Sequence, residues 1–329
     1  MIGQHERPTV AVLTERVSQV VASLRRTPTI ALDGHLIRLF AKLENTQPFS
    51  GSTKDRSVVA IIKQAVADGA IGPTTTVVES SSGNFAVAAA LVCARLGIEF
   101  LPVLDWHVNP HTERLLRAVC RELVVVEPTA STTSGLEARR ACVAELLADR
   151  PKAWWPDQYV NRAPVAAHRD GTAAELLEDV PDVDEIYVAV GTGGTLAGIV
   201  AGVRAAGSRA RVVAVDSVGS TIFGGCPGPR HIPGMGSTRR SEIVDTCAAL
   251  VDEVVLVPEA DSIRGCRELV RRYGILAGGS TGAVYAAIAS GRNKTAGKRI
   301  AFLVADRGAP YLETVYDDAW VQATYGIIP

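Results

Sequence analysis

The chain has 329 residues, of which 47% are hydrophobic and 21% charged, a composition typical of a globular protein long enough for two domains. Its formal net charge of −1 gives no reason to expect nucleic acid or an anionic membrane as a partner. No apolar run reaches the ~18 residues of a membrane-spanning helix. The six cysteines and six histidines show no metal-ligand spacing, so we expect no metal. Free thiols and the absence of an apolar leader favour a cytoplasmic protein.

Strand-like and helix-like segments alternate along the chain. In chain order we expect a strand at 74–80, a helix at 85–97, a strand at 98–104, a helix at 111–120, a strand at 122–128, a helix at 134–150, a strand at 184–190, a helix within 191–207, a strand at 210–216, a helix at 261–274 and a strand at 298–306. Continuous apolar strands alternating with helices predict a doubly wound α/β protein with mainly parallel sheets. Ligands of such folds bind at the carboxyl ends of strands.

One lysine, Lys54, stands where a turn rich in Ser and Gly enters an amphipathic helix, in the stretch "PFSGSTKDRSVVAIIKQAVADG". A phosphate-binding P-loop would need glycine before the lysine, and here Thr53 precedes it. The positive end of the helix dipole disfavours a cation. Lys54 is therefore either a solvated surface residue or an amine with a lowered pKa that suits Schiff-base chemistry.

Three further stretches place small and polar residues at strand-to-helix corners. "ESSSGNFAV" (79–87) offers backbone N–H groups to a carboxylate or phosphate, or simply caps a helix. "VGTGGTLAG" (190–198) suits a phosphate, and it partly matches a nicotinamide-binding loop, with Asp216 about where a ribose-binding acid is expected. "GILAGGSTGAVYAA" (274–287) offers the hydroxyl of Ser280 to a ring nitrogen or to a helix N-terminus.

In this order and spacing, the four stretches resemble those of the fold-type II pyridoxal-phosphate (PLP) enzymes, and specifically the cysteine synthase family. The resemblance extends from residue 27 to residue 320. It implies PLP as cofactor, amino-acid substrates and a homodimer. It also implies two doubly wound domains with the active site between them: a larger PLP-binding domain of residues 1–40 and 153–329, and a smaller mobile domain of residues 41–152.

The resemblance assigns roles to individual residues. Lys54 corresponds to the catalytic Schiff-base lysine, Asn84 to the residue beside the phenolic oxygen, and Ser280 to a neutral partner of the pyridine nitrogen. The phosphate-binding loop is Gly191, Thr192, Gly193, Gly194 and Thr195. The substrate-carboxylate loop is Ser81, Ser82, Gly83, Asn84 and Phe85. Apart from the resemblance, Arg239 is the first candidate to bind a substrate anion, because a guanidinium pairs with phosphate or carboxylate; the alternative is a solvated surface arginine. Tyr159 and His168 are weaker candidates for substrate binding, the alternative for each being a structural role.

Within that family, the chain is similar to the branch that joins O-phospho-L-serine to the amine of L-glutamate through an aminoacrylate, toward 2,3-diaminopropionate for a siderophore or peptide antibiotic. The supporting stretches are 157–161, 215–224, 232–239 and 306–320. Two departures from cysteine synthases favour an acceptor other than sulfide. Phe85 replaces a threonine, and "DRGAPYL" replaces "SSGERYL", which adds Asp306 and Arg307.

Three other functions stay open on the sequence. The first is a cysteine synthase that uses O-phosphoserine or O-acetylserine with sulfide. The second is a non-catalytic homologue that keeps the fold, against which the intact Lys54 argues. The third is a nicotinamide oxidoreductase, which rests on residues 191–194 and does not explain Lys54 or residues 79–85.

Overall fold

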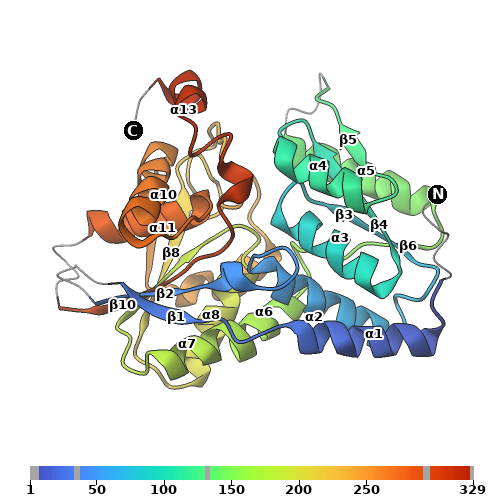
Figure 1. Ribbon diagram of the computed structural model, residues 1–329, viewed down its shortest axis with the longest axis horizontal. Helices are drawn as coiled ribbons and strands as arrows, with labels where there is room; N and C mark the ends of the chain where they lie inside the picture. Colours follow the sequence, from blue (N-terminus) through green and yellow to red (C-terminus); the bar gives the residue numbers. More distant parts are fainter. Residues whose placement is uncertain (1–6, 33–37, 130–133, 292–296, 327–329) are drawn as a thin grey trace. The chain divides into compact units, whose positions relative to one another are not determined.

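The chain forms two compact units, each built on its own sheet (Figure 1). The computed structural model describes residues 7–32, 38–129, 134–291 and 297–326. Unit 1 consists of residues 1–25, 48–50 and 54–163, and unit 2 of residues 26–47, 51–53 and 164–329. Parts of the two expected domains, at residues 1–6, 33–37, 130–133, 292–296 and 327–329, lie outside the described part of the chain.

Unit 1 contains a four-stranded parallel sheet in the order β5-β4-β3-β6. Its strands are β3 (Thr76–Ser80), β4 (Glu99–Asp105), β5 (Val124–Val126) and β6 (Ala153–Trp154). Its helices are α1 (Val10–Ser23), α2 (Lys54–Ala67), α3 (Asn84–Leu96), α4 (Pro110–Val119) and α5 (Gly135–Asp149). Side chains alternate across the sheet. Val77 and Phe100 join the core formed with α1 to α4, whereas Val78 and Leu101 pack with Val143 of α5.

Unit 2 contains a six-stranded sheet in the order β1-β2-β10-β7-β8-β9. Its strands are β1 (Thr29–Leu32), β2 (Arg38–Lys42), β7 (Glu185–Ala189), β8 (Arg211–Ser217), β9 (Glu253–Val257) and β10 (Arg299–Leu303). The β1–β2 pair is antiparallel and the other pairs are parallel. One face packs against α7 to α9, and the opposite face against α10 and α11.

The helices of unit 2 include a π-helical segment, η2. Its α-helices are α6 (Ala163–Ala167, whose first residue falls in unit 1), α7 (Ala174–Asp179), α8 (Gly194–Ala205), α9 (Glu242–Cys247), α10 (Glu259–Tyr273), α11 (Gly279–Ser290) and α13 (Asp318–Tyr325). Shorter turns are η1 (Glu44–Thr46), η2 (His168–Ala173), η3 (Ala248–Leu250) and η4 (Ala309–Tyr311). Among the described residues, no helix has both the length and the apolarity needed to span a membrane.

Helices α10 and α11 cross at two glycines. A methyl group on Gly265 would lie 2.1 Å from the carbonyl oxygen of Gly282, and one on Gly282 would lie 2.2 Å from that of Ser262. Neither glycine has a positive φ, so close backbone approach, and not backbone conformation, requires them. This close crossing holds α11, which carries Ser280, against α10.

The predicted α/β fold with mainly parallel sheets is confirmed, and each strand and helix expected in chain order is present. The division of the chain differs from the expected one at three places: residues 1–25 and residues 153–163 belong to unit 1, and residues 41–47 with 51–53 belong to unit 2. Residues 1–40 were expected to join the larger domain, but α1 belongs to unit 1, because Leu13, Val17 and Val20 pack in the core that α2 and α3 form. Strands β1, β2, β6 and β9 were not expected.

Candidate active site

Lys54 is the first residue of α2, and the chain passes from unit 2 to unit 1 between Thr53 and Lys54. The amide of Thr53 donates to the carbonyl of Ala305, just beyond β10, at 2.9 Å. The buried carboxylate of Asp55 accepts the amides of Phe49 and Ser50 at 2.7 and 2.9 Å. The turn before Lys54 is therefore fixed by hydrogen bonds at both ends, which holds the backbone of this lysine in one place.

The predicted substrate-carboxylate loop, Ser81 to Phe85, joins β3 to α3. Gly83 is the N-cap of α3, so the backbone N–H groups of the first turn of this helix lie at the loop. The hydroxyl of Ser82 accepts the amide of Asp105 at 2.9 Å, and the amide of Ser81 donates to Val103 at 3.2 Å. The loop is thereby tied to the end of β4, and Phe85 is buried in the core beneath it.

Arg139 of α5 supports this loop from the side. Its Nε donates to the hydroxyl of Ser80 and its Nη1 to that of Ser82, both at 3.3 Å, and it forms an ion pair with Asp105. Burial lowers the pKa of Arg139 below its ordinary value. Because arginine keeps its charge in proteins, Arg139 brings a positive charge to the edge of the loop.

Glu79, the residue before Ser80, is a buried carboxyl group with an exposed fraction of 1%. Its Oε1 accepts the indole N–H of Trp155 at 3.0 Å and the amide of Ser80 at 2.8 Å. Burial is the main reason that its pKa rises to about 7, and the negative charge of Asp157 raises it further. Glu79 therefore changes charge near neutral pH directly behind the loop.

Tyr159 lies beside a second arginine in unit 1. Arg140 holds Asp157 through two hydrogen bonds of 3.0 and 3.2 Å, and its guanidinium lies 4.6 Å from the ring centroid of Trp155 and 5.8 Å from that of Tyr159. Tyr159 is partly exposed. The structure thus connects Tyr159 to the arginine–tryptophan pair that borders Glu79.

In unit 2, the predicted phosphate loop, residues 191–195, joins β7 to α8. Gly193 has φ +92°, and a methyl group there would lie 2.5 Å from a side-chain carbon of Val244. Both the backbone conformation and the close packing therefore require glycine at this position. The carbonyl of Thr192 accepts the hydroxyl of Ser241 at 2.7 Å. The amides at the start of the twelve-residue α8 suit a phosphate.

His168 supports the same loop. Its Nε2 lies 3.2 Å from the hydroxyl of Thr195, and its Nδ1 lies 2.9 Å from that of Thr172, within hydrogen-bonding distance in both cases. The imidazole is fully buried. His168 therefore fixes the rotamer of Thr195, and its contacts lie inside unit 2.

Ser280, the other cofactor-binding candidate of unit 2, is the second residue of α11 and is buried. Successive close approaches between chain segments connect the phosphate loop to the start of this helix. A methyl group on Gly191 would lie 3.4 Å from the carbonyl oxygen of Gly234, and one on Gly234 would lie 3.8 Å from the hydroxyl of Tyr311. Tyr311 donates to Asp306, which lies against Gly278 at the start of α11.

These contacts test whether unit 2 fits a phosphate-bearing cofactor. Loop 191–195 supplies helix-start amides and hydroxyls for a phosphate, and the contacts that lead away from it end at Asp306, beside the start of the helix that carries Ser280. A planar ring bound through a phosphate at one end would meet polar groups at the other. The residues present therefore fit PLP.

Arg239 is the predicted residue that the structure does not bring to a motif. It is exposed, and its backbone amide donates to the hydroxyl of Ser237 at 3.1 Å.

Asp216, the acid of the nicotinamide alternative, is fully buried in β8 and accepts the amide of Ser217 at 2.8 Å. A ribose could not reach that carboxylate, which argues against a nicotinamide site.

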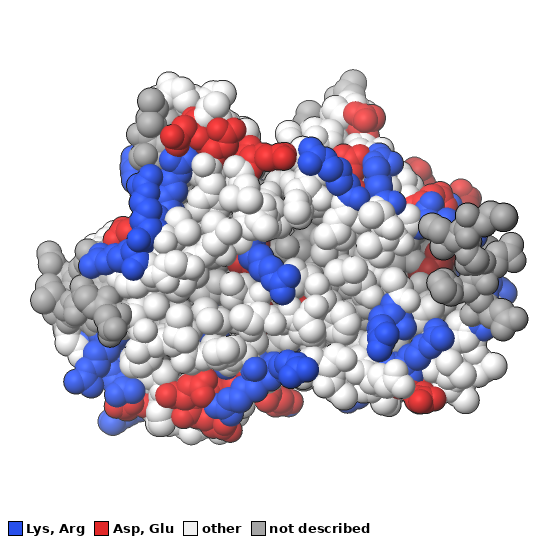
Figure 2. Space-filling view, viewed as in Figure 1, with Lys and Arg blue, Asp and Glu red and all other residues white. Residues whose placement is uncertain are grey.

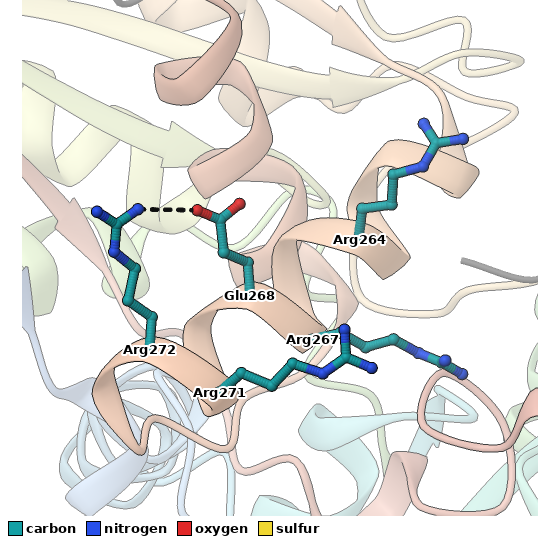
Figure 3. Close-up of a pocket in the computed structure, with 5 residues that line it drawn as sticks. All are labelled: Arg264, Arg267, Glu268, Arg271 and Arg272. Atoms are coloured by element: carbon teal, nitrogen blue, oxygen red, sulfur yellow. Dashed lines mark hydrogen bonds and ion pairs between the residues drawn. The ribbon is translucent and has the colours of Figure 1, made fainter.

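Basic residues also gather on the surface over α10, and on this face of the molecule blue and red side chains are otherwise interspersed (Figure 2). A pocket of about 480 Å³ is lined by α10 alone (Figure 3), through Arg264, Arg267, Glu268, Arg271 and Arg272. Arg272 pairs with Glu268 at 3.2 Å, Arg264 with Asp261, and Arg267 with Asp318. Acidic partners thus neutralise most of its charge, and it is separate from the motifs above.

Three supporting residues were missed on the sequence: Arg139, Ser241 and Tyr311. Ser241 begins α9 as its N-cap, and a serine before "EIV" is a signal that could have been found. Arg139 carries no such signal, because its contacts with Ser80 and Ser82 join segments far apart in the chain. Tyr311 contacts Asp306 only five residues away, but no capping or turn pattern marks that pair.

Fold and motifs together define an α/β enzyme with a site for a phosphate-bearing cofactor. The family model described as "Pyridoxal-phosphate dependent enzyme" matches residues 21–306. The chain belongs to this family, and its cofactor is PLP.

Curated relatives and solved structures agree with this assignment. The N-(2-amino-2-carboxyethyl)-L-glutamate synthase of Ralstonia nicotianae is 40% identical over 92% of this chain and 90% of its own length. The enzyme of the same name from Cupriavidus metallidurans is 38% identical, over 92% and 91%. The crystal structure of O-ureido-L-serine synthase superposes with a TM-score of 0.83 at 28% identity, covering 92% of this chain and 98% of that one. The resemblance to cysteine synthase-like, fold-type II enzymes is confirmed.

Proposed function

We propose that this protein catalyses a PLP-dependent β-replacement in which the amine of L-glutamate displaces phosphate from O-phospho-L-serine. The product would be N-(2-amino-2-carboxyethyl)-L-glutamate. The observation that carries the proposal is the 38–40% identity over 92% of the chain to two synthases of that name. All four motifs of the sequence lie at strand-to-helix corners or helix starts, as such a site requires.

Lys54 is the proposed attachment point of the cofactor and the proposed base. PLP supplies an electron sink for the charge that develops at the substrate Cα when its proton leaves. The amine of Lys54 would take that proton and later return it. A lysine at the start of α2 suits this role, because the positive end of the helix dipole disfavours its ammonium form.

The remaining predicted residues would bind anions. The amides and hydroxyls of residues 81–85 are proposed to hold the substrate carboxylate, and Asn84 to lie beside the phenolic oxygen of the cofactor. Residues 191–195 are proposed to hold the phosphate of PLP. Arg239, which is exposed, and Tyr159, which is partly exposed, stay candidates for the other anionic groups of phosphoserine and glutamate.

Three wider expectations belong to the same proposal. The smaller domain, expected at residues 41–152, would close over bound substrate and exclude water, which competes with the amine. The enzyme would work as a cytoplasmic homodimer. Its product would feed 2,3-diaminopropionate formation for a siderophore or a peptide antibiotic.

The test is a comparison of acceptors and donors on the purified protein with PLP bound. Phosphate release from O-phosphoserine, with the product identified by mass spectrometry, should be faster with glutamate than with sulfide. Faster turnover with sulfide, or with O-acetylserine as donor, would instead indicate a cysteine synthase. The Lys54→Ala variant should lose turnover, and borohydride reduction should leave no cofactor on that peptide. Lys63→Ala, an exposed lysine of the same helix, is the matched control and should behave as the parent does.

A further inference from the structure

His168 begins the π-helical segment η2, which packs directly on α8, the helix that follows the phosphate loop. A methyl group on Gly198 would lie 2.4 Å from the Cβ of His168, and one on Gly202 would lie 2.4 Å from the Cβ of Ala173. Neither glycine has a positive φ, so the close packing of η2 on α8 requires them. π-helical turns are rare, and many lie at functional sites.

This packing places the imidazole of His168 between two threonine hydroxyls. Its Nδ1 lies 2.9 Å from Oγ1 of Thr172, within η2, and its Nε2 lies 3.2 Å from Oγ1 of Thr195, the last residue of the phosphate loop. The exposed fractions of His168 and Thr172 are both 0%, whereas Thr195 is partly exposed. Of these three groups, the hydroxyl of Thr195 is therefore the one that a ligand at the loop can reach.

The tautomer of His168 decides what the hydroxyl of Thr195 offers to such a ligand. A neutral imidazole has one N–H donor and one acceptor nitrogen, and a hydroxyl has one proton to donate. If Nδ1 carries the ring proton, Nε2 accepts the hydroxyl proton of Thr195, and that hydroxyl presents only lone pairs to the loop. If Nε2 carries the ring proton, it donates to Oγ1 of Thr195, and the hydroxyl proton of Thr195 is left to donate into the loop.

We propose that His168 is held as the neutral tautomer with its proton on Nε2, and that it thereby directs the hydroxyl proton of Thr195 at the phosphate of PLP. This role rests on the proposed phosphate loop, residues 191–195, and not on which substrates are used. The oxygens of a phosphate dianion are strong acceptors, so a threonine that binds them must donate. In the other tautomer, the lone pairs of Thr195 would face those oxygens and repel them.

Thr172 completes the arrangement as a donor. When Nδ1 carries no proton, the hydroxyl of Thr172 donates to it, so the hydrogen bonds run in one direction from Thr172 through His168 to Thr195. Hydrogen bonds in such a chain polarise one another, which strengthens the last donation, the one to the phosphate. Because its side chain is fully buried, His168 acts through Thr195 and is a positioning residue.

The first measurement determines the tautomer in the parent enzyme with PLP bound and no amino-acid substrate. Nitrogen-15 NMR of protein labelled in its histidine side chains distinguishes a protonated ring nitrogen from an unprotonated one. The signals of His168 are those that His168→Gln removes or that Thr195→Val shifts. We expect a proton on Nε2 and none on Nδ1. A proton on Nδ1, in a neutral or a charged ring, would overturn the proposal.

The second measurement compares the affinity for PLP with that for pyridoxal, which lacks the phosphate, by absorbance titration of protein from which PLP has been removed. His168→Leu and Thr195→Val should bind PLP about tenfold more weakly than the parent and should bind pyridoxal equally well. His168→Gln, whose side-chain amide can donate to Thr195, should recover most of the PLP affinity. His111→Gln, at an exposed histidine of unit 1, is the control and should match the parent.

A merely structural role for His168 gives a different result, namely equal losses of affinity for PLP and pyridoxal and no recovery in His168→Gln. Either finding would overturn the proposal. Because no amino-acid substrate is present, the choice of acceptor changes neither measurement. An unchanged PLP affinity in Thr195→Val would show that the phosphate loop itself is misassigned, whereas a loss there together with a proton on Nδ1 would overturn the role of His168 alone.

Discussion

Replacing Glu79 by glutamine should raise the free energy of unfolding relative to the parent, and this gain should be larger at pH 8 than at pH 5. Glu79 is buried in β3, and Trp155 and Ser80 both donate to its Oε1. Glutamine can accept the same two hydrogen bonds through its own Oε1 and carries no charge. The substitution therefore removes the ionised state, and the amide NH2 group that it places at the buried Oε2 position changes stability equally at both pH values.

The size of the effect follows from the pKa of Glu79, which burial raises from 4.5 to about 7 in the folded protein. Between these values the folded state keeps a proton that the unfolded state has released, so the parent loses stability as the pH rises. Each pKa unit is worth about 1.4 kcal/mol, and the whole interval about 3 kcal/mol. The loss is complete above pH 7 and absent below pH 4.5.

Denaturant unfolding of the parent and of Glu79→Gln at pH 5 and pH 8 gives the difference in the free energy of unfolding at each pH. The variant should gain about 2 kcal/mol or more relative to the parent between the two values. Glu145→Gln, an exposed position on α5, should show no such gain. An equal difference at both pH values would refute the argument, because Glu79 would then keep one charge state throughout.

Two further predictions concern glycines. Gly265→Ala places a methyl group 2.1 Å from the carbonyl oxygen of Gly282, so the α10–α11 crossing must open, and thermal unfolding should show a loss of stability of about 1–3 kcal/mol or more. Arg264→Ala, on the exposed side of α10, is the control and should cost less than about 1 kcal/mol. Equal losses of stability in the two variants would contradict the packing argument. Gly193→Ala combines a φ of +92° with a contact of 2.5 Å to Val244, so PLP affinity, measured by absorbance titration, should fall at least tenfold. Gly72→Ala, where a methyl group meets no atom within 4 Å, should bind PLP as the parent does, and an unchanged affinity in Gly193→Ala would count against residues 191–195 as the phosphate loop.

The parts of the fold that could be predicted are those whose pattern is local. Strand β3 and helix α3 differ by at most two residues from the expected 74–80 and 85–97, because apolar periodicity and corner residues lie within one short window. The position of α1 could not be predicted in the same way. Its apolar stripe, including Leu13 and Val17, fits either unit, and only the packing against α2 and α3 decides.

The site shows the same division between local and long-range information. Residues 81–85 and 191–195 follow strands and precede helices, so their backbone N–H groups could be predicted from the sequence alone. The contacts of Arg139 with Ser82 and of His168 with Thr195 could not, since each joins two elements that are 27 or more residues apart. Such supporting side chains carry no motif of their own.

Asp306 shows how long-range packing decides which side chains lie beside a motif. On the sequence, Ser280 stands in a recognisable segment before a small-residue helix, and Asp306 appears only as one change in a loop. In the fold, β10 ends next to the start of α11, which brings the carboxylate of Asp306 against Gly278. Gly278 and Asp306 are 28 residues apart in the sequence, so no pattern within one short window predicts that this carboxylate lies at the start of α11.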